Sequence, residues 1–203
     1  MKKAVIKASD IRKIRKKMEK ILDHKRFEHT LGVAYTAAAL AMCCQADTMK
    51  AQMAGLLHDC AKQLPGEKLI EICEKHEIPI TDVERHSPYL LHAKAGSYFA
   101  KKKYNIQDQD ILNAIRNHTT GRPGMSELEK IIYITDYIEP GRKQAPNLSQ
   151  IRQLAFRDLD EALFHVLKDN LAYLQQTNIP MDPMTQETYD HYATLRERKE
   201  DRK

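Results

Sequence analysis

The sequence predicts an all-α protein, and three observations lead to this fold class. Apolar residues recur at helical spacing along the whole chain of 203 residues. No segment shows the pattern of a convincing β-strand. Only 7 glycines are present and 42% of the residues are hydrophobic, whereas a barrel or a sandwich needs many turn residues. The length is enough for one domain with a substantial core and a short extension.

Four helices are expected in the first half of the chain. Residues 9–22 place five apolar side chains on one stripe of an amphipathic helix. Residues 26–45 are apolar on nearly all sides, as expected of a helix in the centre of a bundle. A third helix spans residues 47–62 and ends before Pro65, and a short helix at residues 66–76 follows it.

Two helices are expected in the middle of the chain. The Ser-Pro pair at residues 87–88 opens a helix at residues 89–103, because proline fits the first turn of a helix. The next helix, at residues 107–118, ends where the segment Thr-Thr-Gly-Arg-Pro-Gly begins. That segment, residues 119–124, contains the turn residues through which a helix cannot continue.

Three further helices complete the expected fold. Ser126 and Glu129 have the spacing of a capping box, and the helix that they begin ends just before Pro140. A long helix follows at residues 149–175, and a polar helix begins after Pro183.

The distribution of charge along the chain indicates a charged C-terminal extension and argues against a nucleic-acid partner. The formal net charge is +5, and Lys and Arg are concentrated in residues 12–20 and 195–203. These runs lack interleaved aromatic residues, so solvated helix faces explain them better than a nucleic-acid interface does. The charge is compatible with an anionic small-molecule substrate. We expect residues 1–185 to form one domain and residues 186–203 to form a charged helical extension.

Cysteine usage and the lack of long apolar segments indicate a cytoplasmic protein. The four cysteines, at positions 43, 44, 60 and 73, lie in helical segments without a C-x-x-C spacing. This pattern is typical of reduced thiols in a core. No apolar segment has the length that a signal peptide or a membrane span needs. We therefore expect a cytoplasmic protein that has no membrane partner.

Six ionisable residues lie in unusually apolar surroundings on several predicted helices or at their ends. They are His29, His58, Asp59, His92, His118 and Asp136. Any one of them alone is explained as a core residue that bonds to a neighbour. A buried carboxylate without a partner is costly, however. Convergence of all six on one polar site in the core is therefore the simpler explanation.

The residue types in this set suit a metal site. Imidazole nitrogens and carboxylate oxygens together bind iron, zinc, manganese or nickel, and bundles can hold ligands that project inward from facing helices. The absence of cysteine from the set argues against a closed structural zinc site. Cys60 directly follows Asp59, but neighbouring residues of a helix point about 100° apart. We therefore expect Cys60 to pack into the core.

Five blocks of the sequence carry a resemblance to a known family. They are Arg-Phe-Glu-His-Thr-Leu-Gly-Val-Ala (26–34), Gly-Leu-Leu-His-Asp-Cys-Ala-Lys (55–62), Leu-Leu-His-Ala-Lys-Ala-Gly (90–96), Asn-His-Thr-Thr-Gly (117–121) and Lys-Ile-Ile-Tyr-Ile-Thr-Asp-Tyr-Ile-Glu-Pro-Gly-Arg (130–142). In this order they resemble the HD superfamily of metal-dependent phosphohydrolases. The last two blocks resemble, more narrowly, its YqeK branch, the symmetrical bis(5′-nucleosyl)-tetraphosphatases of bacteria. The resemblance covers residues 10–185.

The resemblance implies an HD-domain helical bundle that cleaves diadenosine tetraphosphate into two ADP molecules at a core site with one or two iron ions. The residues that match primary metal ligands are His29, His58, Asp59 and Asp136. Those that match a second metal site or phosphate contacts are His92 and His118. The implied catalytic residues are Asp59, Lys62 and His92. The implied substrate-binding residues are His29, Asp59, Cys60, Ala61, Lys62, His92, His118, Thr119, Asp136, Arg142, Ile179, Pro180 and Met181.

The implied chemistry is physically sensible. Metal ions neutralise a polyphosphate and lower the pKa of bound water, which supplies hydroxide near neutral pH. Asp59 can bridge two ions, while Lys62 and Arg142 stabilise charge on the phosphate oxygens. From its position alone, Lys62 is equally well explained as a solvent-facing lysine at the end of a helix. Arg26 either reaches the phosphates or pairs in the neighbourhood of Glu28.

Two other functions stay open at this point. The same fold and metal would serve a phosphatase or phosphodiesterase that acts on another nucleotide, because the depth of a pocket cannot be seen in a sequence. A non-catalytic regulator that binds nucleotide or RNA is favoured only by the basic termini, and the full set of six ligand-type residues argues against it. The identity of the metal, the base preference and the oligomeric state are open, and a homodimer is compatible with the sequence.

Overall fold

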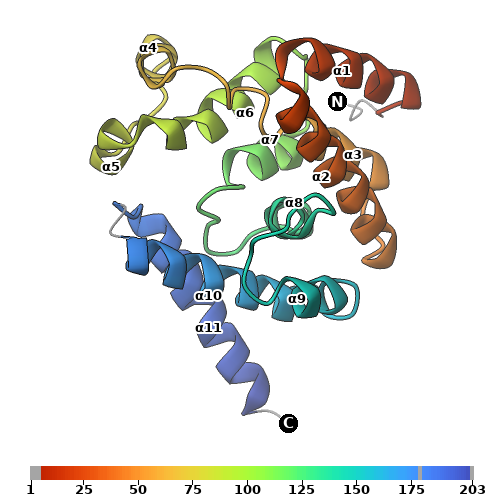
Figure 1. Ribbon diagram of the computed structural model, residues 1–203, viewed down its shortest axis with the longest axis vertical. Helices are drawn as coiled ribbons and strands as arrows, with labels where there is room; N and C mark the ends of the chain where they lie inside the picture. Colours follow the sequence, from red (N-terminus) through yellow and green to blue (C-terminus); the bar gives the residue numbers. More distant parts are fainter. Residues whose placement is uncertain (1–5, 178–179, 202–203) are drawn as a thin grey trace.

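The computed structural model describes residues 6–177 and 180–201, and all regular secondary structure in this part is helical (Figure 1). In chain order the helices are α1 (Ala8–Ile21), α2 (His24–Cys43), α3 (Thr48–Leu57), α4 (Gly66–Lys75), α5 (Asp82–His86), the 3₁₀ helix η1 (Pro88–Leu91), α6 (His92–Lys102), α7 (Gln109–Arg116), α8 (Glu127–Ile138), α9 (Leu148–Ala155), α10 (Leu159–Thr177) and α11 (Pro183–Glu200). No strand occurs among these residues, so the predicted all-α fold is confirmed. None of the described helices is both long and apolar enough to span a membrane.

Helices α2, α3, α7 and α8 pack against one another in the centre of the molecule (Figure 1). Helix α1 packs on α3, α6 packs on α7, α9 and α10 pack on α8, and α11 packs on α10. Leu40, Met53, Ile115 and Ile132 are among the fully buried side chains of this core. Burial of each such side chain contributes about 1.5–3 kcal/mol. The four central helices therefore form the main hydrophobic core of the molecule.

Polar caps fix the first residues of several helices. Asp47 accepts hydrogen bonds from the first turn of α3, and Ser126 and Glu129 form the predicted capping box of α8. Helix α1 begins one residue before the predicted residue 9, and Lys7 occupies its N-cap position.

Helix α3 ends at Leu57, so the prediction of a helix that continues to Lys62 is wrong. Residues 58–64 form turns instead, in which the N–H of Lys62 donates to the carbonyl of Asp59 at 2.9 Å. Such bonds span three residues, whereas the bonds of an α-helix span four. The tighter chain path carries His58 and Asp59, both of which are buried.

The single long helix predicted at residues 149–175 is two helices, α9 and α10, separated by residues 156–158. Asp158 explains the break, because its carboxylate accepts the N–H of Glu161 at 3.0 Å at the start of α10. Aspartate is among the residues preferred at this position. Both helices keep an apolar stripe, so periodicity alone did not indicate the interruption.

A second, smaller core lies between α4, η1 and α6. It contains Leu69, Cys73 and Leu91, all fully buried. Helices α5 and η1 border this core and were not predicted as separate elements. The beginning of α5 is fixed by a capping box of Thr81 and Glu84, which resembles the box at the start of α8.

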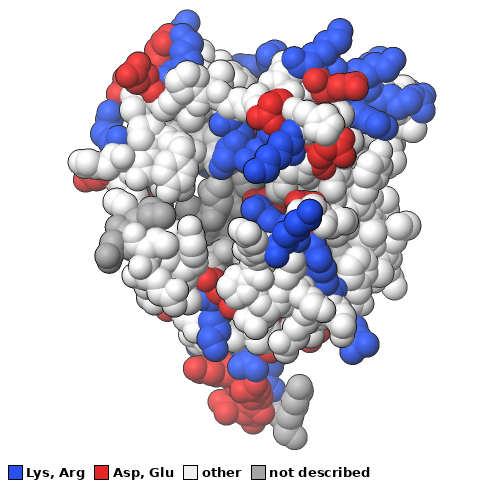
Figure 2. Space-filling model, viewed as in Figure 1, with Lys and Arg blue, Asp and Glu red and all other residues white. Residues whose placement is uncertain are grey.

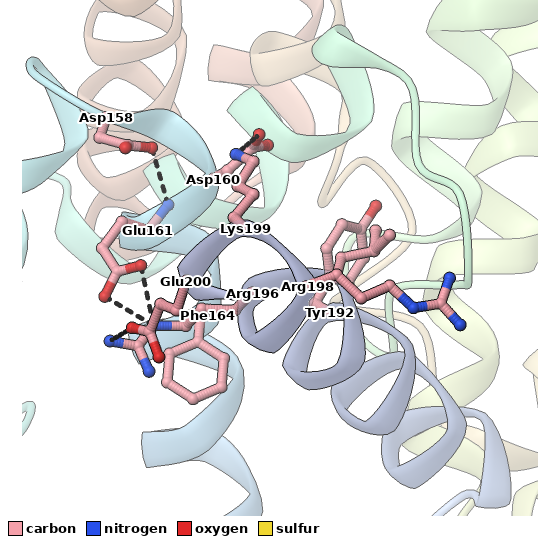
Figure 3. A pocket seen from close by; sticks show the side chains of 10 residues that line it. Asp158, Asp160, Glu161, Phe164, Tyr192, Arg196, Arg198, Lys199 and Glu200 are labelled. Carbon is pink, nitrogen blue, oxygen red and sulfur yellow. Dashed lines mark hydrogen bonds and ion pairs between the residues drawn. The ribbon is translucent and has the colours of Figure 1, made fainter. Parts of the chain in front are cut away.

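The C-terminal helix α11 packs along α10, and a pocket of about 390 Å³ lies beside their contact (Figure 3). There the guanidinium of Arg196 lies 4.8 Å from the ring centre of Phe164 and 3.0 Å from the carboxylate of Glu161. None of the predicted site residues lines this pocket. The domain boundary predicted between residues 185 and 186 falls within α11, and it stays a prediction.

Candidate functional site

The six predicted ligand-type residues converge on one site among the central helices. Helix α2 supplies His29, the turn after α3 supplies His58 and Asp59, α6 begins with His92, the turn after α7 supplies His118, and α8 supplies Asp136. Four of the six are almost fully buried. His29 and Asp136 are the more accessible, with 10% and 25% of their side chains exposed. The cluster is therefore reached from solvent on the side of Asp136.

The carboxylate of Asp59 lies at the centre of this cluster. Its Oδ1 is 3.2 Å from Nε2 of His92 and 3.6 Å from Nε2 of His118. Its Oδ2 is 3.5 Å from Nε2 of His58 and 3.9 Å from Nε2 of His29. The two oxygens of one carboxylate therefore face two different pairs of imidazoles.

Hydrogen bonds at Nδ1 hold all four imidazoles with Nε2 pointing into the site. Nδ1 of His58, His92 and His118 is bonded to the carbonyl of the residue three positions earlier, at 2.6–2.7 Å. The carboxylate of Glu139 takes this role for His29, at 3.1 Å. Because a carbonyl oxygen only accepts, the hydrogen of His58, His92 and His118 lies on Nδ1. His29 has a carboxylate at each nitrogen, since Oδ1 of Asp136 lies 3.1 Å from its Nε2. Histidines that bind metals almost always have such an outer hydrogen bond.

The inward-facing nitrogens fit a metal ion because, apart from Lys62 beside His92, the described residues give their lone pairs no donor. Nε2 of His29 and Nε2 of His58 are buried without a hydrogen bond. Nε2 of His92 and Nε2 of His118 are only 3.1 Å apart, although both are acceptors when Nδ1 carries the hydrogen. Such nitrogen and oxygen atoms suit a divalent cation. The sets of three ligand atoms that lie close enough to share an ion are His29–His58–Asp59, His58–His118–Asp136 and Asp59–His92–His118.

Burial and neighbouring groups set the protonation of the central residues. Burial alone would raise the pKa of Asp59, but the imidazoles of His58, His118 and His92 keep it well below its ordinary value. Burial lowers the pKa of His92 to about 4. At neutral pH the carboxylate is therefore ionised and this imidazole is neutral, which are the forms that bind a metal.

His29 differs from His92 in its electrostatic surroundings. Burial alone would lower its pKa, but the carboxylates of Asp136 and Glu139 raise it overall. Nε2 of His29 lies 3.1 Å from Oδ1 of Asp136. A proton and a metal ion therefore compete for the same nitrogen of His29.

Two cationic side chains lie directly against the cluster. Nη1 of Arg26 is 2.8 Å from Oδ2 of Asp59. Nζ of Lys62 is 3.3 Å from Nε2 of His92, and burial lowers the pKa of Lys62. Lys62 therefore lies against the cluster and is not the solvent-facing lysine that its sequence position alone permitted.

Arg142 provides a third cation at the open side of the cluster. Its Nη2 lies 3.0 Å from Oδ1 of Asp136, and 44% of its side chain is exposed. Figure 2 shows Lys and Arg side chains gathered beside a hollow in the middle of the same face as in Figure 1. Cations beside a buried set of metal-ligand atoms suit an anionic ligand that approaches a bound metal.

A pocket of about 460 Å³ adjoins the cluster. Its lining includes Thr119, which follows His118, and Tyr89, whose carbonyl is bonded to Nδ1 of His92. The remaining lining residues are Leu90, Thr120, Asn170, Tyr173, Leu174, Pro180, Met181, Asp182 and Thr185. A mostly apolar and aromatic lining with a few polar groups is typical of a small-molecule site.

The predicted substrate-binding residues outside the cluster lie in different environments. Thr119, Pro180 and Met181 share the lining of this pocket, whereas Ile179 lies outside the described residues. The side chain of Cys60 is buried in the main core, as expected, and that of Ala61 is buried in the smaller one. Neither of these two residues lines the pocket.

Two residues of the site had no assigned role in the sequence. For Arg26 the sequence left open a phosphate contact or a pairing near Glu28, and in the structure Arg26 contacts Asp59 instead. Glu139 appeared only within the fifth sequence block, yet it is buried and bonded to His29. The signal that indicates Glu139 is its position three residues after Asp136, because residues so spaced are neighbours on a helix surface.

Comparison with known proteins agrees with this arrangement. A model of the HD domain matches residues 26–141, a segment that contains all six ligand-type residues. The chain belongs to the HD-domain family. The HD-domain match begins at Arg26 and stops one residue before Arg142. Part of the adjoining pocket, including Pro180 and Met181, therefore lies outside the matched segment.

Relatives of this HD-domain protein are similar over most of its length. The symmetrical bis(5′-nucleosyl)-tetraphosphatase of Bacillus subtilis (strain 168) is 43% identical over 169 residues, which are 83% of this chain and 90% of the relative. The protein of the same name from Staphylococcus aureus (strain NCTC 8325 / PS 47) is 34% identical over 194 residues, 95% of this chain and 99% of the relative.

A solved HD-domain structure shares the fold. It is the crystal structure described as a predicted HD superfamily hydrolase involved in NAD metabolism from Clostridium acetobutylicum. The TM-score is 0.88 at 43% sequence identity, and the likeness covers 94% of this chain and 100% of the other. The family resemblance seen in the five sequence blocks is thereby confirmed.

Proposed function

We propose that this HD-domain protein hydrolyses diadenosine tetraphosphate symmetrically and produces two molecules of ADP. The observation that carries the proposal is the 43% identity to a relative named symmetrical bis(5′-nucleosyl)-tetraphosphatase, over 90% of that relative's length. The buried histidine–aspartate cluster supports it, because phosphoanhydride cleavage is a reaction that metal ions accelerate. The cations beside the cluster suit a polyphosphate chain.

The metal ligands in this proposal are His29, His58, Asp59 and Asp136, and His92 and His118 are available to a second ion. The two oxygens of Asp59, which face different imidazole pairs, support a bridging role for this carboxylate. We propose iron as the resident metal, as one or two ions, because mixed nitrogen and oxygen ligands suit it. The same ligands accept other divalent metals.

The reaction needs one water molecule for each substrate. Its oxygen bonds to one of the two central phosphorus atoms, while the bond from that phosphorus to the central bridging oxygen breaks. The bridging oxygen leaves with the second ADP, and the protons of the water are released. A bound divalent ion supplies charge neutralisation and a lowered pKa for the attacking water.

Three side chains have catalytic roles in this scheme. Asp59 binds the metal, and Lys62 holds phosphate oxygens and offsets the charge that develops on the departing ADP. Nε2 of His92 points into the site, so it would hold a second ion or, at a site with one ion, would accept a proton from the attacking water. Arg142, at the open side, holds a phosphate farther along the chain.

The pocket beside the cluster is the proposed site of one nucleoside. Thr119 lies between the metal ligand-type residue His118 and this pocket, so it contacts the phosphate next to the nucleoside. Pro180 and Met181 supply apolar contacts to the base or sugar.

The cytoplasmic location and a homodimeric state stay predictions.

Replacement of Asp59 by alanine tests the metal site within this proposal. Asp59→Ala removes both oxygens that face the histidine pairs, so we expect the purified protein to lose its bound metal and its turnover to fall to background. Metal analysis and ADP release are measured on the same sample, with circular dichroism as the check of folding. Asp160→Ala is a matched control that should retain both properties, because Asp160 pairs with Lys130 and is not a member of the cluster. Normal turnover in folded Asp59→Ala protein would contradict the proposal.

A further inference from the structure

Glu139 is a buried carboxylate that links the end of α8 to His29 on α2. Only 4% of the residue is exposed. Its Oε1 lies 3.1 Å from Nδ1 of His29, and its Oε2 accepts the main-chain N–H of Gly141. Among the described residues, no Lys or Arg forms an ion pair with Glu139. Because a buried carboxylate without partners is costly, these two N–H groups account for its place in the structure.

His29 needs a partner from outside its own helix because of where it lies. It is an interior residue of α2, where main-chain carbonyls are used by the helix itself. His58, His92 and His118 lie at or next to helix ends, and each bonds through Nδ1 to a carbonyl three residues earlier. Glu139 therefore provides for His29 the acceptor that the main chain provides for the others.

Two glycines, Gly32 and Gly141, leave room for the carboxylate of Glu139, because each lacks the Cβ atom that would collide with it. A Cβ atom at Gly32 would lie 2.5 Å from Oε2 of Glu139, and a Cβ atom at Gly141 would lie 2.9 Å from it. Gly32 is one turn after His29, on the same face of α2. The main chain of the turn that begins at Glu139 is held independently of the Glu139 side chain, because Arg152 donates to the main-chain carbonyl of Glu139 at 2.7 Å.

We propose that Glu139 is a positioning residue that keeps the hydrogen of His29 on Nδ1 and so presents the lone pair of Nε2 to a metal ion. This role rests on the metal site of the proposed function. It is distinct from the roles of the cluster residues, because Glu139 acts on the metal only through His29. Loss of an outer hydrogen-bond partner of this kind lowers metal affinity by about 10- to 100-fold.

Glu139→Gln tests this role with little change of shape. The amide has one oxygen, which can accept from His29 or from Gly141 but not from both. Where the amide nitrogen faces Nδ1, the hydrogen of His29 moves to Nε2 and blocks metal binding. We expect the affinity for Mn²⁺ to fall about 10- to 100-fold. Free Mn²⁺ is followed by electron paramagnetic resonance during titration of the metal-free, full-length protein.

Glu129→Gln is the matched control. Glu129, like Glu139, is a buried glutamate, and it lies in the first turn of α8. Glu129 pairs with Arg122 and Asn117 and has no contact with the cluster. We expect this variant to bind Mn²⁺ as the wild type does. Wild-type affinity in Glu139→Gln, or an equal loss of affinity in Glu129→Gln, would overturn the proposal.

The tautomer of His29 in the wild type gives a test that needs no folded variant. The carboxylate of Asp136, 3.1 Å from Nε2 of His29, competes with Glu139 for the same hydrogen. In ¹⁵N-resolved NMR of the metal-free protein, at a pH where His29 is neutral, we expect Glu139 to prevail, with hydrogen on Nδ1 and none on Nε2. Hydrogen on Nε2 would overturn the proposal. A wild type that binds Mn²⁺ but leaves diadenosine tetraphosphate intact would contradict the proposed function alone, and the role of Glu139 would stand.

Discussion

Single side chains divide the site into an inner set of acceptors and an outer set of cations. Each of the four imidazoles is fixed through Nδ1, so their lone pairs point at one carboxylate, that of Asp59. Arg26, Lys62 and Arg142 surround this set. An inner layer of acceptors suits a metal cation, and an outer layer of cations suits the phosphates that the metal would bind.

Replacement of Lys62 tests the outer layer. Nζ of Lys62 is close enough to the cluster to contact a phosphate there, but an ammonium group is no metal ligand. We expect Lys62→Ala to lower kcat by about 10²–10³-fold and to leave the metal content unchanged. Steady-state ADP release and metal analysis measure the two effects. Lys68→Ala, on the exposed surface of α4, is the control. A loss of metal that parallels the loss of kcat would assign Lys62 to the inner layer instead.

The ligand-type residues could be predicted from the sequence, whereas their supporting residues could not. An ionisable residue among apolar neighbours is unusual, and this local feature distinguishes His58 and Asp136 in the sequence itself. Glu139 lies beside a Pro-Gly turn, where an acidic residue is ordinary, and Arg26 lies in a polar first turn of a helix. Their roles depend on contacts between distant segments, 110 residues apart for Glu139 and His29, which no local pattern contains.

Helix ends, more than helix interiors, supply the site. The turn after α3, the start of α6 and the turn after α7 each contribute a histidine whose Nδ1 bonds to a carbonyl that a helix end leaves available. The sequence predicted most helices but missed the ends of two of them. Apolar periodicity continues through the turn at residues 156–158, while the N-cap preference of Asp158 indicates the true break.

The turn between α7 and α8 should make the fold sensitive to acid. Burial alone would raise the pKa of Glu129, but Arg122, the N–H of Ser126 and Asn117 hold it below its ordinary value of 4.5. Because the pKa is lower in the folded than in the unfolded state, the ionised carboxylate stabilises the fold above pH 4.5, and this contribution is lost as the pH falls through the folded-state pKa.

Comparison of the wild type with Glu129→Gln measures this contribution. We expect the variant to be less stable by about 1–3 kcal/mol near neutral pH, since hydrogen bonds to a charged group are weakened. The difference should shrink as the pH is lowered below 4.5, when the wild-type carboxyl becomes protonated. Urea unfolding midpoints at several pH values provide the measurement. A difference that stays constant across this range would show that ionisation of Glu129 does not stabilise the fold.

Across the whole molecule, the site joins helices that are far apart in the chain. The residues of the cluster come from the segment that runs from α2 to α8. The pocket beside the cluster also needs Asn170 and Tyr173 of α10, together with residues just before α11 and in its first turn. Composition and periodicity predicted the all-α class, because both are properties of the chain alone. The packing of α10 and α11 beside η1 and Thr119 depends on long-range contacts, so the pocket could not be predicted in the same way.

A bound metal should stabilise the molecule as a whole, because its ligands come from several helices and do not form a site in the unfolded chain. At a free metal concentration 100 times the dissociation constant, we expect a gain of about 2.7 kcal/mol. For a chain of this length, this corresponds to a rise in Tm of about 5–10 °C. Thermal unfolding with Mn²⁺ and with a chelator measures the effect, and Asp59→Ala should not show it. An equal Tm in both conditions for the wild type would contradict a metal site in the core.

Product analysis tests the central claim, that this HD-domain protein cuts diadenosine tetraphosphate at its centre with a bound metal. Metal-loaded protein is incubated with the substrate, the nucleotides are separated by chromatography, and the metal content of the same sample is measured. We predict ADP as the sole nucleotide product, formed at a rate that rises in proportion to the bound metal. Formation of AMP together with ATP, or of ADP by protein that contains no metal, would contradict the account.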